Sequence, residues 1–194
     1  MGYVVTTAPS IEPVTLIDAK LHLRVDHALD DSSISTLITA ARETVEKRSK
    51  RTLISTAYRL DQCEFATYTG PICIEKGPLI AVQSVKYYDT AGTLQTIAST
   101  NYRTDVTERR GYVLPVSGYV WPVVQIQRPN AVQVAFTAGY GTAATDVPAA
   151  ARQAMLLLIG TWYENRESVS ESEMMKVPDA ADALIATVAS PKFF

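Results

Sequence analysis

Apolar residues near the start of the chain recur at intervals of three and four, which is the period of an amphipathic helix. The pattern covers about residues 15–24 and returns over 34–49, where the opposite side is charged. Thr15 and Asp18 have the spacing of a capping box, so the first helix is expected to begin there. An acidic cluster between the two stretches is expected to form a loop and to cap the second helix: Asp26, Asp30 and Asp31.

The same period returns near the other end of the chain. Asp146, followed by Pro148 in the first turn, is expected to be the N-cap of a helix over about residues 149–166. Apolar residues cover most of the circumference of this stretch, so it is expected to lie centrally, with neighbours on several sides. A last helix is predicted over about residues 180–189.

Between these helices the pattern alternates with a period of two, and β-branched and aromatic residues stand between turn residues. Asp89 to Gly92 is predicted to be a tight hairpin turn in which Gly92 takes a positive φ. The predicted strands are Thr56 to Cys63, Pro71 to Glu75, Val82 to Asp89, Leu94 to Ile97, Tyr102 to Thr107, Gly111 to Leu114 and Ala131 to Thr137.

This order of elements predicts an α+β fold, because the helices at the two ends of the chain can bury their apolar faces by packing against one another. We expect a helical bundle built from the N- and C-terminal helices, with an antiparallel β lobe inserted between them. In a single domain of 194 residues, the parts would be helices in 13–52, the β lobe in 53–141, helices in 146–189 and a tail in 190–194.

Composition narrows the possible functions. Hydrophobic residues make up 47% of the chain and charged residues 20%, which is typical of a globular protein. Eighteen Lys and Arg against 20 Asp and Glu leave a net charge of −2, which argues against a dedicated nucleic-acid binder. The start has no basic and apolar run typical of a secretory signal, and the most apolar stretch, residues 154–162, is too short to cross a bilayer. We therefore expect residence in the cytoplasm and no membrane partner.

Residues with catalytic or metal-binding potential are sparse. The chain has no GxSxG, P-loop or GxGxxG pattern, and its two histidines, His22 and His27, are five residues apart without an evident third ligand. Cys63 and Cys73 lack a metal-ligand spacing and are expected to be reduced, half-buried strand residues. No enzyme activity, no metal and no cofactor are expected.

The one concentrated basic feature follows the second helix and the residues just past its end: Arg42, Lys47, Arg48, Lys50 and Arg51. Cations near a helix C-terminus are stabilising without any ligand, through the helix dipole. The alternative is a patch that faces phosphate or an acidic partner, and its binding would depend steeply on salt. Such a patch would suit a nucleic-acid-binding accessory protein that uses the second helix.

Two pairs of large apolar residues lie outside the predicted helices and strands. Met174 and Met175 follow a polar stretch, and Phe193 and Phe194 close the chain. Either pair can fold back on its own core, or it can be a docking anchor that orders on assembly.

Several short motifs, in this order, resemble the head-tail connector (adaptor or head-completion) proteins of tailed phages, prophages and gene transfer agents. The resemblance runs from about Pro13 to Glu167. It is carried by Asp18 to Asp26, Leu37-Ile38, Ala40 to Arg42, Val85 to Asp89 with Gly92, Trp121-Pro122, Arg128 to Val132, Ala138 to Gly141, Val147-Pro148, Arg152 to Ala154 and Trp162 to Glu167. Where such proteins often have a Tyr-Thr-Gly-Arg turn after the second helix, this chain has Arg48-Ser49-Lys50-Arg51.

The resemblance implies a structural virion protein without catalysis, located in the neck at the head-tail junction. Such proteins form a ring, typically of twelve copies, beneath the portal once DNA has been packaged. The ring extends the DNA channel, which DNA passes without sequence-specific binding, and offers a platform to the next neck or tail-completion protein. The candidates to face this channel or its DNA are the basic residues Arg42, Lys47, Arg48, Lys50 and Arg51. Free subunits are expected to stay monomeric in the host cytoplasm until the portal is present. The C-terminal segment of such proteins can reach into the portal, which gives Phe193 and Phe194 a candidate docking role.

Overall fold

The computed structural model describes residues 2–106, 110–165 and 179–189. Its contacts divide the chain into two compact units. A sheet unit combines Met1–Pro9 with Ser55–Tyr140, and a helical unit combines Ser10–Ile54 with Gly141–Phe194. Helices and antiparallel sheets are both present, so the predicted α+β class is confirmed.

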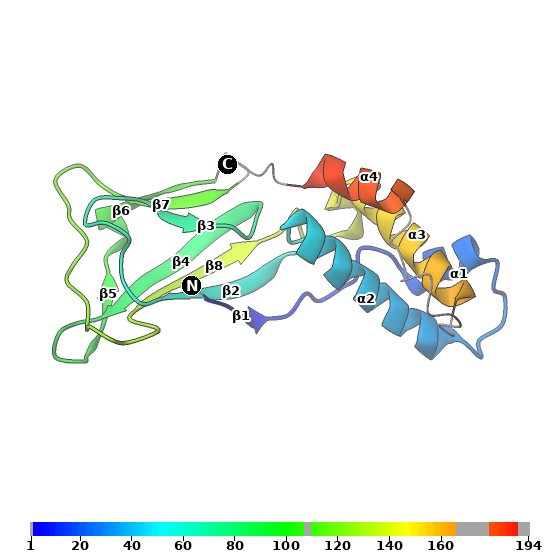
Figure 1. The fold of residues 1–194 in the computed structure, drawn as a ribbon, viewed down its shortest axis with the longest axis horizontal. Coiled ribbons are helices and arrows are strands. Elements are labelled where there is room, and N and C mark those ends of the chain that lie inside the picture. Colours follow the sequence, from blue (N-terminus) through cyan, green and yellow to red (C-terminus); the bar gives the residue numbers. More distant parts are fainter. Residues whose placement is uncertain (1, 107–109, 166–178, 190–194) are drawn as a thin grey trace. The chain divides into compact units, whose positions relative to one another are not determined.

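The helical unit joins helices from both ends of the chain (Figure 1). They are α1 (Leu16–Leu23), α2 (Asp31–Ser49), α3 (Ala149–Glu164) and α4 (Asp179–Val188). As its apolar circumference predicted, α3 packs against each of the other three helices. Its fully covered side consists of small and apolar residues: Ala151, Ala154, Met155, Leu158 and Ile159. The remaining large residues of α3, such as Leu156 and Trp162, are only half-buried.

The helix ends confirm one predicted cap and correct two. At α1, Thr15 Oγ1 accepts from the backbone N–H of Asp18 at 3.1 Å, and the Asp18 carboxylate in turn accepts from the backbone N–H of Thr15, which completes the capping box. Asp30 occupies the N-cap of α2 but makes no side-chain cap bond, because its carboxylate accepts from the Tyr163 hydroxyl at 2.5 Å. Asp146 is not the N-cap of α3: it ends the short 3₁₀ helix η2 (Ala144–Asp146), where its carboxylate accepts from the backbone N–H of Ala143.

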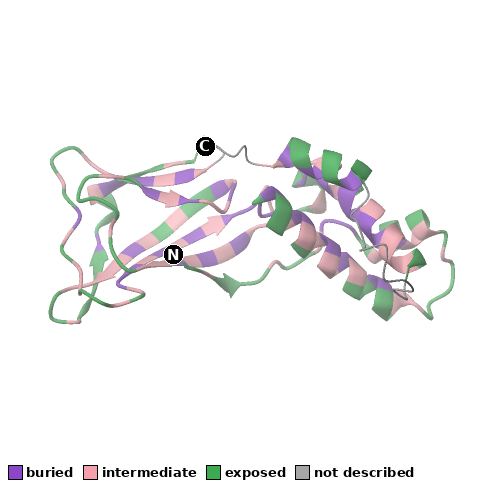
Figure 2. Ribbon diagram, in the orientation of Figure 1, coloured by how far each residue is buried: buried purple, intermediate pink, exposed green. Residues whose placement is uncertain are grey.

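The sheet unit contains two antiparallel sheets that share one core. The larger has the order β1-β2-β8-β4-β5, from β1 (Gly2–Thr7), β2 (Thr56–Gln62), β8 (Val132–Ala138), β4 (Leu79–Tyr88) and β5 (Leu94–Ile97). The smaller has the order β3-β7-β6, from β3 (Ile72–Ile74), β7 (Gly111–Pro115) and β6 (Tyr102–Asp105), and the 3₁₀ helix η1 (Ser99–Asn101) precedes β6. Figure 2 shows buried and partly exposed residues alternating along the central strands, as the period of two predicted.

Turn and glycine positions explain two local features of this unit. The hairpin after β4 has the predicted form: Gly92 has φ +82°, and the Asp89 carboxylate accepts from the backbone N–H groups of Ala91 and Thr93. These hydrogen bonds, together with one from the Gln95 side chain, hold the pKa of Asp89 below its ordinary value. Gly111 lies where a β-carbon would come within 2.4 Å of the Leu79 side chain, so the two sheets approach closely at this point.

Two features of the sheet unit differ from the expectation. The N-terminal segment Gly2–Thr7 forms β1 and pairs with β2, so one strand of the lobe precedes the helices. Cys63 is exposed directly after β2, whereas Cys73 is half-buried in β3 as expected.

No helix within the described ranges is long and apolar enough to cross a membrane.

Candidate functional site

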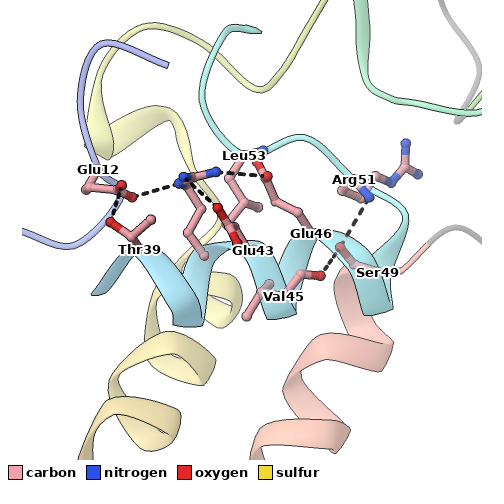
Figure 3. Close-up of polar contacts among 9 residues, drawn as sticks. Glu12, Thr39, Glu43, Val45, Glu46, Ser49, Arg51 and Leu53 are labelled. Carbon is pink, nitrogen blue, oxygen red and sulfur yellow. Dashed lines mark hydrogen bonds and ion pairs between the residues drawn. The ribbon is translucent and has the colours of Figure 1, made fainter. Parts of the chain in front are cut away.

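The basic residues at the end of α2 were the candidate site, and Arg42 is the first of them. Its guanidinium lies among three carboxylates: Nε is 2.8 Å from Glu12, Nη1 is 3.2 Å from Glu46 and Nη2 is 3.8 Å from Glu43. The Arg42 side chain is only 12% exposed. Figure 3 shows the carboxylates of Glu12, Glu43 and Glu46 around this single guanidinium.

Burial disfavours the charge of Arg42, but the carboxylates of Glu12 and Glu46 more than offset this and raise its pKa above the ordinary value. The Glu46 carboxylate also accepts from the backbone N–H of Leu53 at 2.7 Å. The cluster therefore ties the segment before α1 and the segment after α2 to the middle of α2. Arg42 has a structural role in this unit.

Arg48 and Arg51 connect α2 to α4. Arg48 forms an ion pair with Asp182, in which both side chains remain exposed. Arg51 is buried, and its Nε donates to the backbone carbonyl of Val188 at 3.4 Å. The Ser49 hydroxyl accepts from the backbone N–H of Arg51 at 3.2 Å (Figure 3). Both arginines thus help to hold the last helix against α2.

Lys47 and Lys50 are exposed on the surface of the helical unit, as Arg48 is, but within the described residues neither lysine forms an ion pair. Lys50 is the C-cap of α2 and has φ +56°, a left-handed conformation that favours glycine. This is the turn at which the chain departs from the common pattern of the connector proteins that it resembles. Of the five predicted basic residues, the two lysines and the exposed side of Arg48 are available to a partner.

The remaining candidates are the two apolar pairs near the end of the sequence. Met174, Met175, Phe193 and Phe194 lie outside the described residues. Within the described ranges, no group of three or more His, Cys, Asp and Glu side chains could hold a metal ion.

One feature that sequence reasoning missed is an open groove on the helical unit, with a volume of about 360 Å³. Val14 and Ile38 are its buried apolar residues, and Ser35 and Thr39 belong to its polar side. Its residues come from the segment before α1, from α1, from α2 and from η2: Ile11, Glu12, Val14, Thr15, Leu16, Ser35, Ile38, Thr39 and Ala144. The periodicity of α2 marks Ile38 as apolar, but no local pattern shows that its neighbours leave an open space.

Known proteins share both the sequence pattern and this fold. The sequence model described as "Phage gp6-like head-tail connector protein" matches residues 13–115. No curated protein matches the sequence.

Solved structures match along the whole chain. A chain from the neck of an empty gene transfer agent (GTA) particle, computed with C6 symmetry, has a TM-score of 0.82 at 23% identity and covers 100% of this chain and 98% of its own. A chain from the virion of a native GTA particle has a TM-score of 0.81 at 22% identity, with the same coverage. At this identity the likeness shows a common fold.

The family model covers more than half of the chain, including α1, α2 and strands β2 to β7. The family's description is that of a structural component and points away from enzymatic activity. The chain belongs to the phage gp6-like head-tail connector family.

Proposed function

We propose that this protein is a structural subunit of the neck of a phage-like particle, where copies form a ring beneath the portal. The ring extends the DNA channel after packaging and provides the docking platform for the next neck or tail-completion protein. The observation that carries the proposal is the family match over residues 13–115. The full-length likeness in fold to a chain from a GTA neck supports it.

The parts of the chain act together in this proposal as one connector subunit. The helices within 13–52 and 146–189 form the bundle, the β lobe of 53–141 is the second body, and the tail of 190–194 extends to the portal. Before assembly the subunit is in the host cytoplasm, as a monomer. A closed ring suits this behaviour, because weak contacts between neighbours add up only when the ring is complete.

In the proposed neck, the tail of residues 190–194 contacts the portal directly. Phe193 and Phe194 are the docking anchors, and Met174 and Met175 form a second adaptable contact. Deletion of residues 191–194 is expected to abolish attachment to the portal and to leave the fold intact. Lys192→Ala is the matched control, because it changes the same segment and keeps both rings.

The test uses the tagged full chain in cells that produce particles. Bound proteins are identified by mass spectrometry, and the particles are viewed by negative-stain microscopy. Recovery of portal protein, with a ring of density at the head vertex, supports the proposal. Recovery of host nucleic acid or metabolic enzymes without capsid proteins refutes the proposed function. Normal incorporation of the tail-deleted chain into particles refutes only the role of the tail.

The channel-facing role is assigned to Lys47 and Lys50. Arg42 and Arg51 are engaged within the helical unit, so reversing them would damage the fold and give no information on DNA. The variant Lys47→Glu/Lys50→Glu is expected to form particles that retain less DNA. Arg103→Glu, an exposed position on β6, is the control for added negative charge. Normal DNA retention by the double variant would place both lysines on a solvent-facing surface.

The alternative of a nucleic-acid-binding accessory protein makes a different prediction. It requires the second helix to bind free duplex DNA with a steep dependence on salt. The internal contacts of Arg42 and Arg51 reduce the charge available for such binding. Measurable binding of purified protein to duplex DNA, lost in the double lysine variant, would favour this alternative.

A further inference from the structure

Helix α1 has four large apolar residues. Leu16 and Leu23 are half-buried, whereas Ile17 and Leu21 lie on the side that faces away from the helical unit. Ile17 and Leu21 are each 78% exposed, and they lie on the same face of the helix because they are one turn apart. Ala19, the one residue of α1 that is fully covered, lies on the opposite side, since successive residues are rotated by about 100°. A helix that exposes two large aliphatic residues one turn apart is typical of an interface. We call the pair Ile17 and Leu21 the α1 ridge.

The groove of about 360 Å³ on the same unit has an apolar part that could receive the aliphatic side chains of the ridge. Its apolar part includes Val14, Leu16 and Ile38. Leu16 belongs to α1, and the ridge is rotated by about 100° to 140° from Leu16 around the helix axis. A rigid helix therefore cannot place the ridge in the groove of its own chain. The ridge and the groove can combine only between two copies.

Charges next to the two surfaces are complementary. Ser35, Thr39 and Glu43 follow one another at intervals of four along α2, so Glu43 extends the face of α2 that contributes to the groove. The Glu43 carboxylate is 3.8 Å from the Arg42 guanidinium and remains 68% exposed. Beside the ridge, Arg24 is exposed three residues after Leu21, at the C-cap of α1. An exposed carboxylate thus extends the face of the groove. At the ridge, the Asp18 carboxylate is engaged with Thr15 in the cap of α1, and Arg24 is an exposed cation.

We propose that the α1 ridge of one copy seats in the groove of a second copy, with Arg24 of the first next to Glu43 of the second. The contact uses different surfaces on its two sides, so it is heterologous and closes into a ring when the rotation between copies fits. The inference rests on the proposed function, because it names the contact between subunits of that ring. Each contact is modest, and ring closure supplies the avidity.

Disulfide trapping with the purified full chain tests the contact, because it captures weak complexes. Two variants are mixed in a Cys63→Ser background, which removes the exposed native thiol. One carries Leu21→Cys on the ridge and the other Ser35→Cys at the groove, both at exposed positions. The control replaces the groove variant by Gln95→Cys, which is exposed on β5 of the sheet unit. Circular dichroism verifies that each variant is folded.

Seated thiols react at an effective concentration in the millimolar range, so at about 0.1 mM protein the mixed disulfide is expected to form faster than in the control pair, by up to about tenfold when most ridges are seated. Arg24→Glu on the ridge variant is expected to remove most of this advantage. Adding Glu43→Arg to the groove variant is expected to restore it, because the charges are then exchanged. Arg24→Gln is the matched control, which lacks the repulsion.

Equal rates for the ridge–groove pair and the control pair would overturn the proposed contact. Fastest trapping of the Leu21→Cys variant with itself would also overturn it, since ridge would then meet ridge. If the contact fails while the tagged chain still recovers portal and neck density, only this inference is wrong. If the chain recovers no capsid protein, the proposed function fails, whatever the trapping shows.

Discussion

Replacing Arg42 by Met is expected to destabilise the helical unit strongly. The substitution keeps an unbranched apolar stem and removes the guanidinium that lies among Glu12, Glu43 and Glu46. The Glu46 side chain is 12% exposed and the Glu12 side chain 31%, so water compensates only part of the lost charge. Two carboxylates would then repel one another next to the apolar core of the unit.

The magnitude follows from the burial of the partners. Removing one member of a fully buried ion pair costs about 3–5 kcal/mol, because an uncompensated charge stays inside. The partial exposure of Glu12 lowers this, and we expect a loss of about 2–4 kcal/mol in the free energy of unfolding. The matched control is Arg48→Met on the same helix. Its ion pair with Asp182 is exposed on both sides, so its loss should cost no more than about 1 kcal/mol.

Urea unfolding followed by far-ultraviolet circular dichroism measures both changes, since the long helices belong to the helical unit. Adding Glu12→Gln to Arg42→Met is expected to recover part of the stability, because it removes one of the unpaired charges. The reasoning fails if Arg42→Met costs no more than Arg48→Met. It also fails if Glu12→Gln does not improve the Arg42→Met variant.

Three further predictions concern local backbone and titration. Lys50→Gly should be about 1 kcal/mol more stable than Lys50→Ala in urea unfolding, because φ at this position is +56°; equal stabilities would mean that the turn carries no strain. Gly111→Ala should cost about 1–3 kcal/mol through overlap with Leu79, whereas Gly2→Ala, with open space around it, should cost little; similar values would contradict the close approach of the sheets. Burial raises the pKa of Tyr3 to about 12, so the folded state holds this proton more tightly than the unfolded state. The resulting stability is complete below pH 10 and is lost as the pH rises toward 12, and Tyr3→Phe should lack this loss in unfolding measured across the range.

The helices and seven of the eight strands could be predicted from the sequence, because burial on one face imposes a local period. The strand β1 escaped this reasoning. All of its residues except Tyr3 are exposed, so no alternation marks it. It exists through pairing with β2, more than fifty residues away, with Tyr3 packed against Phe136. Only the tertiary structure brings these partners together.

The candidate site shows the same limit for charged residues. In the sequence, the five basic residues after the middle of α2 look like one patch. In the structure, Arg42 meets Glu12 thirty residues earlier, and Arg51 meets Val188 near the other end of the chain. These contacts leave Lys47, Lys50 and the exposed side of Arg48 at the surface. A run of like charges predicts a surface only when no distant partner folds against it.

Local order therefore determined much of what the sequence could reveal: the kind of each element, the α+β class, the cap of α1, the hairpin turn after β4 and the family resemblance. The tertiary structure decided which side chains are free. Ile17 and Leu21 have the spacing of core residues, yet α1 packs with Ala19 and exposes both. Periodicity arises from neighbours along the chain, whereas burial arises from neighbours in space. Only the tertiary structure therefore shows which apolar residues, such as Ile17 and Leu21, stay exposed and available for assembly.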